Sequence, residues 1–148
     1  MIHVVADASV AIKWFLPPTA AEQDQDRALT LLEMVKSRDI VLREPPHWLV
    51  EVAAVLSRLA PATARQDIDD LCTMRIPVMA TPKIYATAIE IAVSLNQHLF
   101  DTLYHAVALD TPDCTLITAD EHYYKKARKR GSIILLRDFK PVPGSPSS

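Results

Sequence analysis

Short apolar runs alternate along this chain with segments in which apolar residues recur at helical spacing. The runs are rich in β-branched residues and are bounded by turn or charged residues, which predicts strands at residues 2–6, 40–42, 78–80, 114–118 and 133–136. Because these runs are uniformly apolar and lack alternation, they predict strands that are buried on both faces. The pattern indicates an α/β fold of three layers, α/β/α, with a central parallel β-sheet.

Helices are predicted between these runs, and prolines mark several of their ends. Pro17 and Pro18 stop the first helix, Pro45 and Pro46 begin the third, and Pro61 ends it. The predicted helices cover residues 7–16, 28–36, 46–59, 62–75, 83–95, 101–109 and 121–129. A single domain over residues 1–140 follows, with a tail at residues 141–148 that we expect to be disordered.

The overall composition sets few limits on the partners of the chain. A formal charge of −2 and a pI near 6.2 give no global attraction to nucleic acid, so polyanion binding requires a local basic patch or bound metal. The first residues have no basic region, and no apolar run is long enough to span a membrane, so we expect a cytoplasmic protein. Cys72 and Cys114 lie far apart and are interpreted as core thiols.

Glycine is scarce, which excludes several enzyme classes. Gly131 and Gly144 are the two glycines of the chain, and they are well separated. A P-loop, a Rossmann dinucleotide fingerprint and a G-x-S-x-G nucleophile elbow each need closely spaced glycines. ATP hydrolysis by a P-loop, NAD chemistry and ordinary serine hydrolysis are therefore excluded.

Four acidic residues are the candidates for the chemistry of the chain. Asp7 and Asp120 directly follow predicted strands, at the sheet edge where open parallel α/β folds bind ligands, although each also suits a helix N-cap. Glu51 shares a helix face with apolar residues, so it needs a partner, either a cation such as Arg58 or Arg43 or a metal. Asp101 begins a predicted helix, where capping is again an alternative role.

Taken together, these acids predict a metal site. Carboxylates that converge at one sheet edge repel one another unless a cation lies between them. Mg²⁺ and Mn²⁺ accept carboxylate oxygens, keep several waters and bridge to phosphate. An all-carboxylate site therefore indicates phosphodiester or phosphoryl chemistry, with the metal activating a water.

Four segments that carry these acids resemble the PIN-domain nucleases, in particular the VapC-type toxins of toxin–antitoxin pairs. The resemblance covers nearly the whole chain and lies in Val4-Val5-Ala6-Asp7-Ala8-Ser9-Val10 with Lys13-Trp14-Phe15-Leu16-Pro17 after it, Pro46-His47-Trp48-Leu49-Val50-Glu51-Val52, Phe100-Asp101-Thr102-Leu103-Tyr104-His105-Ala106-Val107-Ala108 and Leu116-Ile117-Thr118-Ala119-Asp120.

The resemblance implies more than the residues alone establish. It implies that Asp7, Glu51, Asp101 and Asp120 are the metal-binding catalytic set, with Ser9 and Thr118 as polar supports. It also implies a PIN-like fold, Mg²⁺-dependent cleavage within RNA strands, a homodimer, and neutralisation by a cognate antitoxin protein that occupies the groove of the site.

Other polar and aromatic residues are weaker candidates. A basic cluster at the end of the chain is suited to an RNA backbone, but we favour its interpretation as a solvated helix face; it comprises Lys125, Lys126, Arg128, Lys129 and Arg130. The histidines show no metal-ligand spacing. Trp14, Phe15 and Trp48 are interpreted as core residues, with base stacking as the alternative.

Two other functions compete with a nuclease. A phosphoacceptor receiver domain also places acids at strand ends, but the paired acids, the phosphorylated aspartate and the lysine that it needs are absent from the corresponding places. The second alternative is a catalytically silent PIN-like module that binds protein or RNA; the presence of all four acids argues against it.

Overall fold

The computed structural model describes residues 2–18 and 24–141, and the elements follow the order that the apolar pattern predicts. The strands are β1 (Ile2–Ala6), β2 (Ile40–Leu42), β3 (Cys114–Thr118) and β4 (Ile133–Leu135). The α-helices are α1 (Ala8–Ala11), α2 (Gln25–Lys36), α3 (Trp48–Leu59), α4 (Ala64–Thr73), α5 (Pro82–Leu95), α6 (Leu99–Asp110) and α7 (Glu121–Ala127). Short 3-10 helices are η1 (Ile12–Trp14), η2 (Arg128–Arg130) and η3 (Leu136–Asp138).

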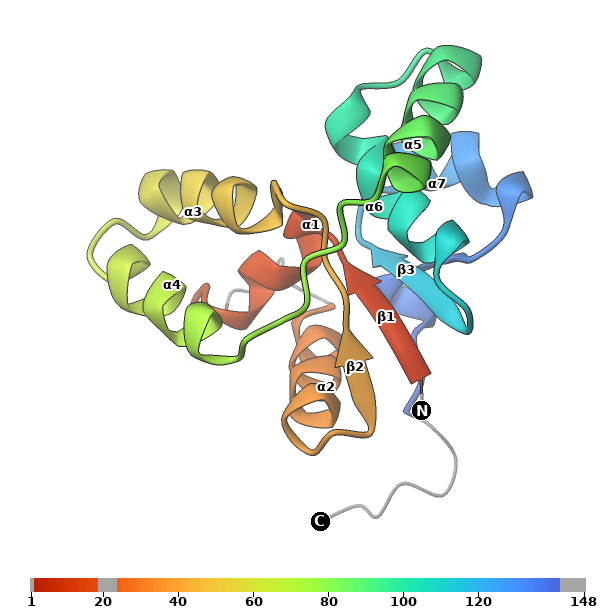
Figure 1. Ribbon diagram of the computed structural model, residues 1–148. Helices are drawn as coiled ribbons and strands as arrows, with labels where there is room; N and C mark the ends of the chain where they lie inside the picture. Colours follow the sequence, from red (N-terminus) through yellow and green to blue (C-terminus); the bar gives the residue numbers. More distant parts are fainter. Residues whose placement is uncertain (1, 19–23, 142–148) are drawn as a thin grey trace.

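The described strands form one parallel sheet in the order β2-β1-β3-β4 (Figure 1). In the register, Val4 lies opposite Leu42 on one side and Thr115 on the other. The central strands β1 and β3 are buried over most of their length. Their carboxyl ends therefore lie side by side, which places the residues after Ala6 and Thr118 at one edge of the sheet.

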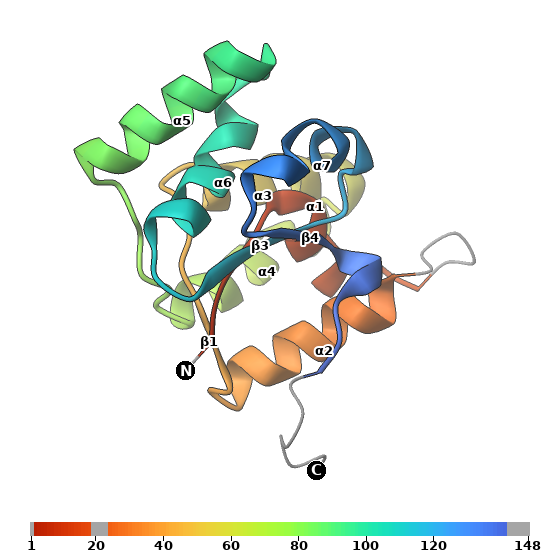
Figure 2. The same ribbon diagram turned by 90° about the vertical axis from the view of Figure 1, so that its right-hand side faces the viewer.

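Helices cover both faces of the sheet and complete the three-layer α/β/α architecture that the sequence predicts. Helix α6, backed by α5, lies on one face, and α2 lies on the other (Figure 2). Two helical pairs, α3–α4 and α5–α6, extend on either side of the end of β1 (Figure 1). The predicted site thus lies where β1 ends between these pairs.

Local sequence signals explain several helix ends. Thr81 accepts a hydrogen bond from the amide of Ile84 and Pro82 is the first residue of α5, which is the usual pairing of cap and proline. Asn96, which follows the last residue of this helix, adopts a left-handed conformation with φ of 50°, a usual way for a helix to end. These signals also set the start of α6, because the chain turns at Asn96 and Gln97 before it.

Residues 78–80 do not form a strand, so that prediction was wrong. Glu44 and Val78 make an isolated parallel bridge, in which the amide of Met79 donates to the carbonyl of Glu44. The segment is short, follows Pro77, and leaves Val78 64% exposed. A three-residue apolar run without a covering layer therefore gains too little burial to extend the sheet.

Other boundaries and environments also differ from the predictions. The first predicted helix is short and continues as η1, α6 begins at Leu99, and the last predicted helix ends at Ala127 and continues as η2. Cys114 is buried as predicted, whereas Cys72, on α4, is exposed, so its prediction as a core thiol was wrong. The predicted disorder at residues 141–148 concerns residues that, apart from Pro141, lie outside the described ranges. No helix in those ranges is long and apolar enough to cross a membrane.

Candidate active site

All four predicted acids line one pocket at the carboxyl edge of the sheet. The pocket has a volume of about 310 Å³ and is lined by Asp7, Ala8, Ser9, Ile12, Glu51, Val55, Arg58, Leu59, Asp101, Tyr104 and Asp120. Asp7 and Asp120 follow β1 and β3, whereas Glu51 comes from α3 and Asp101 from the first turn of α6. The fold thus gathers acids that are far apart in sequence, as predicted.

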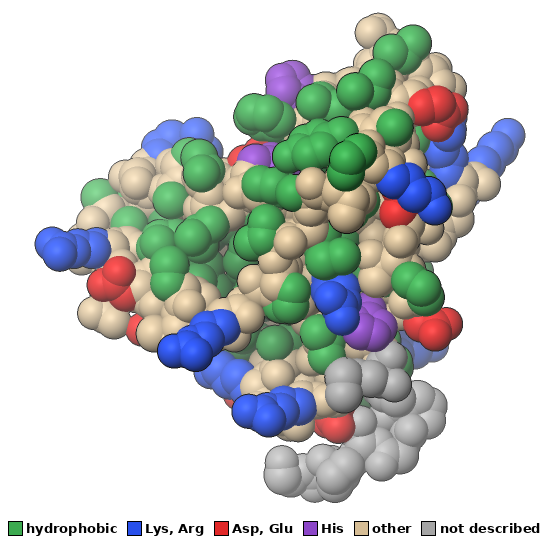
Figure 3. Space-filling view, viewed as in Figure 1, with side chains coloured by type: hydrophobic (Ala, Val, Ile, Leu, Met, Phe, Trp, Pro, Cys, Tyr) green, Lys and Arg blue, Asp and Glu red, His purple; other side chains and the backbone are tan. Residues whose placement is uncertain are grey.

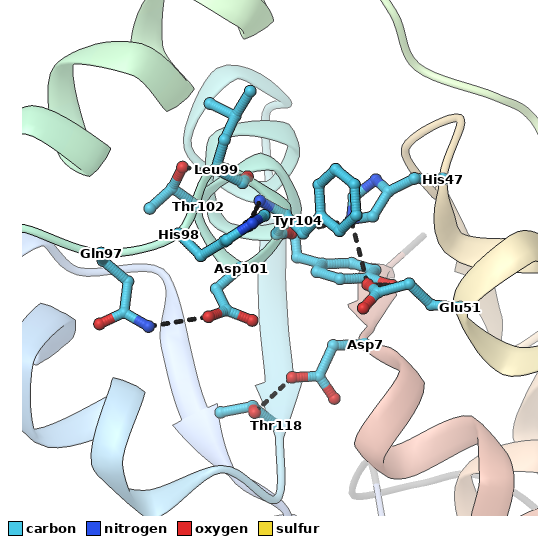
Figure 4. Close-up of polar contacts among 11 residues, drawn as sticks. Asp7, His47, Glu51, Gln97, His98, Leu99, Asp101, Thr102, Tyr104 and Thr118 are labelled. Atoms are coloured by element: carbon cyan, nitrogen blue, oxygen red, sulfur yellow. Dashed lines mark hydrogen bonds and ion pairs between the residues drawn. The ribbon is translucent and has the colours of Figure 1, made fainter. Parts of the chain in front are cut away.

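Asp7 is held at the end of β1 by two hydroxyl groups. Thr118 donates to its Oδ2 (Figure 4). Ser9 donates to its Oδ1, and the amide of Val10 also donates to Oδ1 at 3.3 Å. Burial raises the pKa of this carboxyl to about 6, the hydrogen bonds oppose the rise, and the charge of Asp120 adds to it. Asp7 therefore caps α1. Its charged form is destabilised by burial and by Asp120, and a bound cation would stabilise it.

Ser9 and Thr118 also connect the ends of the two central strands. The amide of Ala119 donates to Ser9 Oγ at 3.0 Å, and the amide of Asp120 donates to Thr118 Oγ1 at 3.0 Å. Each hydroxyl thus donates to Asp7 and accepts from the backbone after β3. The positions that the sequence predicts as supports lie in contact with Asp7.

Glu51 is held in the charged form by groups around it. Tyr104 Oη donates to Glu51 Oε1 at 2.7 Å, and His47 Nε2 lies 3.2 Å from the same oxygen. The hydrogen bond from His47 is the largest cause of a lowered pKa of Glu51, against a smaller opposing effect of burial. Arg43, one of the alternative partners considered for Glu51, donates to His3 Nδ1 instead. His47, one helical turn before Glu51, forms the contact with the carboxylate.

Asp101 faces the pocket from the opposite helical pair. Gln97 Nε2 donates to its Oδ2 at 2.7 Å, and Figure 4 shows the carboxylates of Asp7, Asp101 and Glu51 around the same space. Gln97 Oε1 in turn accepts a hydrogen bond from Lys126 Nζ at 3.2 Å. The start of α6 therefore presents Asp101 through a side-chain amide that is itself fixed.

A fifth carboxylate lies beside the site, and the sequence did not reveal it. Glu44 is 1% exposed, and its Oε2 accepts a hydrogen bond from the amide of Ala6 at 2.9 Å. The side chain thus pairs with the end of β1 beyond the last residue of β2, Leu42. Burial raises the pKa of Glu44 well above its usual range, and the charge of Asp7 raises it further.

The chemistry of the donor set fits a hard divalent cation. The acids supply oxygen atoms, the charge of Asp120 adds to the raised pKa of Asp7, and no cysteine or zinc-type histidine pair lines the pocket. Within residues 2–18 and 24–141, no three acidic, histidine or cysteine side chains lie close enough to form a ready ion cage. Each carboxylate instead faces its own hydrogen-bond partner, so the site is gathered but its side chains are not preformed around an ion.

The basic cluster divides into two groups. Lys126 contacts the end of α5 through the carbonyl of Leu95 and Gln97, and Arg130 forms an ion pair with Glu90 at 2.8 Å. Lys125, Arg128 and Lys129 are exposed. The cluster does not lie on one helical face, because α7 ends at Ala127. Part of it therefore fastens α7 to α5, and its role toward RNA stays a hypothesis.

The remaining aromatic and histidine predictions concern the core. Trp14 and Trp48 are buried and their rings pack edge to face with centroids 6.5 Å apart. His105 is fully buried between Tyr123 Oη and the carbonyl of Gly131, and burial lowers its pKa. These residues are structural, as the sequence predicts.

Comparisons with known proteins agree with this geometry. The family model described as the PIN domain matches residues 4–129. The solved structure of PAE2754 from Pyrobaculum aerophilum is similar at a TM-score of 0.64 and 18% identity, over 92% of this chain and 90% of that one. No curated protein matches the sequence. At this identity the solved structure supports the fold alone.

Proposed function

Because the chain belongs to the PIN-domain family, a nuclease-type domain, we propose that it is a metal-dependent endoribonuclease. The observation that carries the proposal is the single pocket into which four separate elements each place a carboxylate. Asp7 and Asp120 cap α1 and α7, but capping does not require four acids to share one pocket, where they repel one another and burial raises the pKa of Asp7. Binding of a cation and a phosphodiester explains why the fold tolerates this cost.

The residues of the pocket divide the work between them. Asp7, Glu51, Asp101 and Asp120 would hold Mg²⁺ or Mn²⁺, which would supply a nucleophilic water at neutral pH and neutralise charge on the phosphate. Ser9 and Thr118 orient Asp7 through its two oxygens. Tyr104 and His47 keep Glu51 ionised and aimed at the pocket.

The direct test is cleavage of single-stranded RNA by the purified full chain. We expect cleavage with Mg²⁺ or Mn²⁺ and no cleavage with EDTA. Asp7→Asn and Asp101→Asn should each lower the cleavage rate by about 100-fold or more, as expected when a group that stabilises the transition state is removed. Asp69→Asn, an exposed aspartate of α4, is the matched control and should retain full activity. Undiminished cleavage by both site variants would refute the proposal.

A second level of the proposal concerns biological role. The family resemblance supports a toxin of a VapC-type toxin–antitoxin pair, acting as a homodimer and inhibited by an antitoxin protein. Helix α5 exposes a stripe of apolar residues at one-turn intervals, Tyr85, Ile89 and Val93, which is consistent with a subunit interface. A short adjacent reading frame, growth arrest on expression that this partner relieves, and a dimeric mass in light scattering are the expected results.

The competing function is a silent module that binds RNA or protein. It predicts association without metal-dependent cleavage, and unchanged association in Asp7→Asn. The contact between the basic cluster and RNA is tested separately: if Lys125 and Lys129 bind phosphate, their alanine variants should each reduce the slope of log affinity against log salt by about 1. An unchanged slope supports the solvated-face interpretation.

A further inference from the structure

A row of aromatic rings leads to the surface from Tyr104, which lines the acid-lined pocket and donates to Glu51. The His47 ring lies 4.6 Å from that of Tyr104 and 5.0 Å from that of Phe100, and the Phe100 ring lies 4.7 Å from that of His98. Tyr104 is 3% exposed, whereas Phe100 is 47% exposed. The row of rings thus begins beside a site carboxylate and ends in solvent.

Hydrogen bonds fix this row. His47 Nε2 donates to the carbonyl of Phe100 at 2.8 Å, which joins the loop before α3 to the first turn of α6. The amide of Phe100 donates to His98 Nδ1 at 3.0 Å. Both the amide and the carbonyl of Phe100 are therefore hydrogen-bonded. Because this residue is already ordered, the protein loses little conformational entropy when a ligand stacks on its ring.

Phe100 lies outside the hydrophobic core and contacts only the rings of His47 and His98 among the aromatic side chains described. The core is filled by other residues, and the adjacent Asp101 is the residue that faces the pocket. Figure 3 shows a histidine and an acidic side chain together where the α3–α4 pair meets the α5–α6 pair, bordered by hydrophobic side chains. A flat apolar ring beside carboxylates suits a ligand that has both an aromatic face and a phosphate.

We propose that Phe100, flanked by His98 and backed by His47, is a stacking platform for one unpaired base of the RNA, next to the phosphate that the carboxylate pocket receives. This inference rests on the proposed nuclease function and adds a binding subsite to it. Stacking on an aromatic side chain is available to every base and needs no positive charge. It therefore supplies affinity in a pocket whose own charge is negative, and it favours single strands or loops over duplex RNA.

The test combines protein variants with abasic substrates. An oligoribonucleotide series with one abasic position each should show, for the wild type, a loss in kcat/KM when the base next to the cleaved bond is missing. Phe100→Ala should lower kcat/KM on the intact substrate by about 5- to 100-fold, mainly through KM, and should show no further loss at that abasic position. Phe100→Trp should retain activity, and Phe100→Leu should fall between the two.

Leu29→Ala, which also removes an exposed apolar side chain but lies on α2 at the other face of the sheet, is the matched control. Thermal melts check that the variants fold. Unchanged kcat/KM in both Phe100→Ala and Phe100→Leu would overturn the platform, as would a change confined to oligomeric state. If the wild type cleaves no RNA but Phe100→Ala weakens its binding to single-stranded RNA, the platform stands and the nuclease proposal fails.

Discussion

Gln97 holds Asp101 in the pocket through a side-chain amide that donates at 2.7 Å to one carboxylate oxygen. The amide oxygen of Gln97 accepts a hydrogen bond from Lys126, so the amide nitrogen is the atom that faces Asp101. Gln97→Glu places a negative charge against Asp101 and should reduce metal affinity or cleavage by about 10- to 100-fold. Lys126→Met should act in the same direction more weakly.

The chain offers a matched control for this prediction. Gln66 donates to Asp70 at 2.9 Å on the exposed surface of α4, with the same chemistry and no contact with the pocket. Gln66→Glu should therefore leave Mn²⁺ affinity, measured by titration calorimetry, unchanged. Equal affinities of Gln97→Glu and the wild type would refute the positioning role of Gln97.

Metal binding should depend on pH through Asp7. Its pKa near 6 means that the metal-free site is partly protonated in mildly acidic solution, and an ion must displace that proton. We expect Mn²⁺ affinity to be nearly constant above pH 7 and to fall by about tenfold per pH unit below 6. Calorimetry in buffers of different ionisation enthalpy should show proton release near pH 6; equal affinity at pH 5 and 7 would exclude this linkage.

Thr118 should support both Asp7 and the turn after β3. Thr118→Val removes the hydroxyl that donates to Asp7 and accepts from the amide of Asp120. We expect a loss of about 10-fold in metal affinity and about 1–3 kcal/mol in the free energy of unfolding, since an amide loses its partner. Thr118→Ser should recover most of both, and Thr115→Val, on the same strand, is the control.

Glu44 should make the stability of the metal-free protein decrease with rising pH. Its pKa is raised in the folded state, so below the unfolded value near 4.5 both states are protonated and there is no penalty. As the pH rises from there through the folded pKa, the unfolded state ionises more readily, and the free energy of unfolding falls. Glu44→Gln retains an acceptor for the amide of Ala6 and should flatten this dependence.

Denaturant unfolding in EDTA at several pH values measures this effect. Glu33→Gln, at an exposed position of α2, should leave the wild-type slope unchanged. Glu44→Ala should lower stability by about 1–3 kcal/mol because the buried amide of Ala6 loses its partner. A slope in Glu44→Gln equal to that of the wild type would show that another group is responsible.

The sequence predicted the sheet because burial on both faces leaves an unbroken apolar run, as in Ile2–Ala6 and Cys114–Thr118. The same rule failed at residues 78–80, where an equally apolar run lies outside the layers. The location of Asp7 and Asp120 was predictable for a related reason, since parallel strands end at a common edge.

Contacts between distant segments could not be predicted from the sequence. Glu44 lies just beyond the end of β2, and the sequence of so short a strand does not indicate which backbone amide the following glutamate will bond. The contact from Lys126 to Gln97 joins residues on separate helices, and the exposure of Phe100 depends on which face of α6 packs on the sheet. Each requires the tertiary arrangement rather than a local pattern.

The hydrogen bond from His47 to the carbonyl of Phe100 joins the two helical pairs that flank the pocket. Glu51 and Asp101 lie on opposite sides of this bridge, so local opening of the α3–α4 pair would widen the site while the sheet stays intact. Amide exchange in α3 should then be faster than in β1 and β3. An RNA strand that contacts both pairs in this arrangement should slow exchange in both at once, because binding stabilises the state that it contacts.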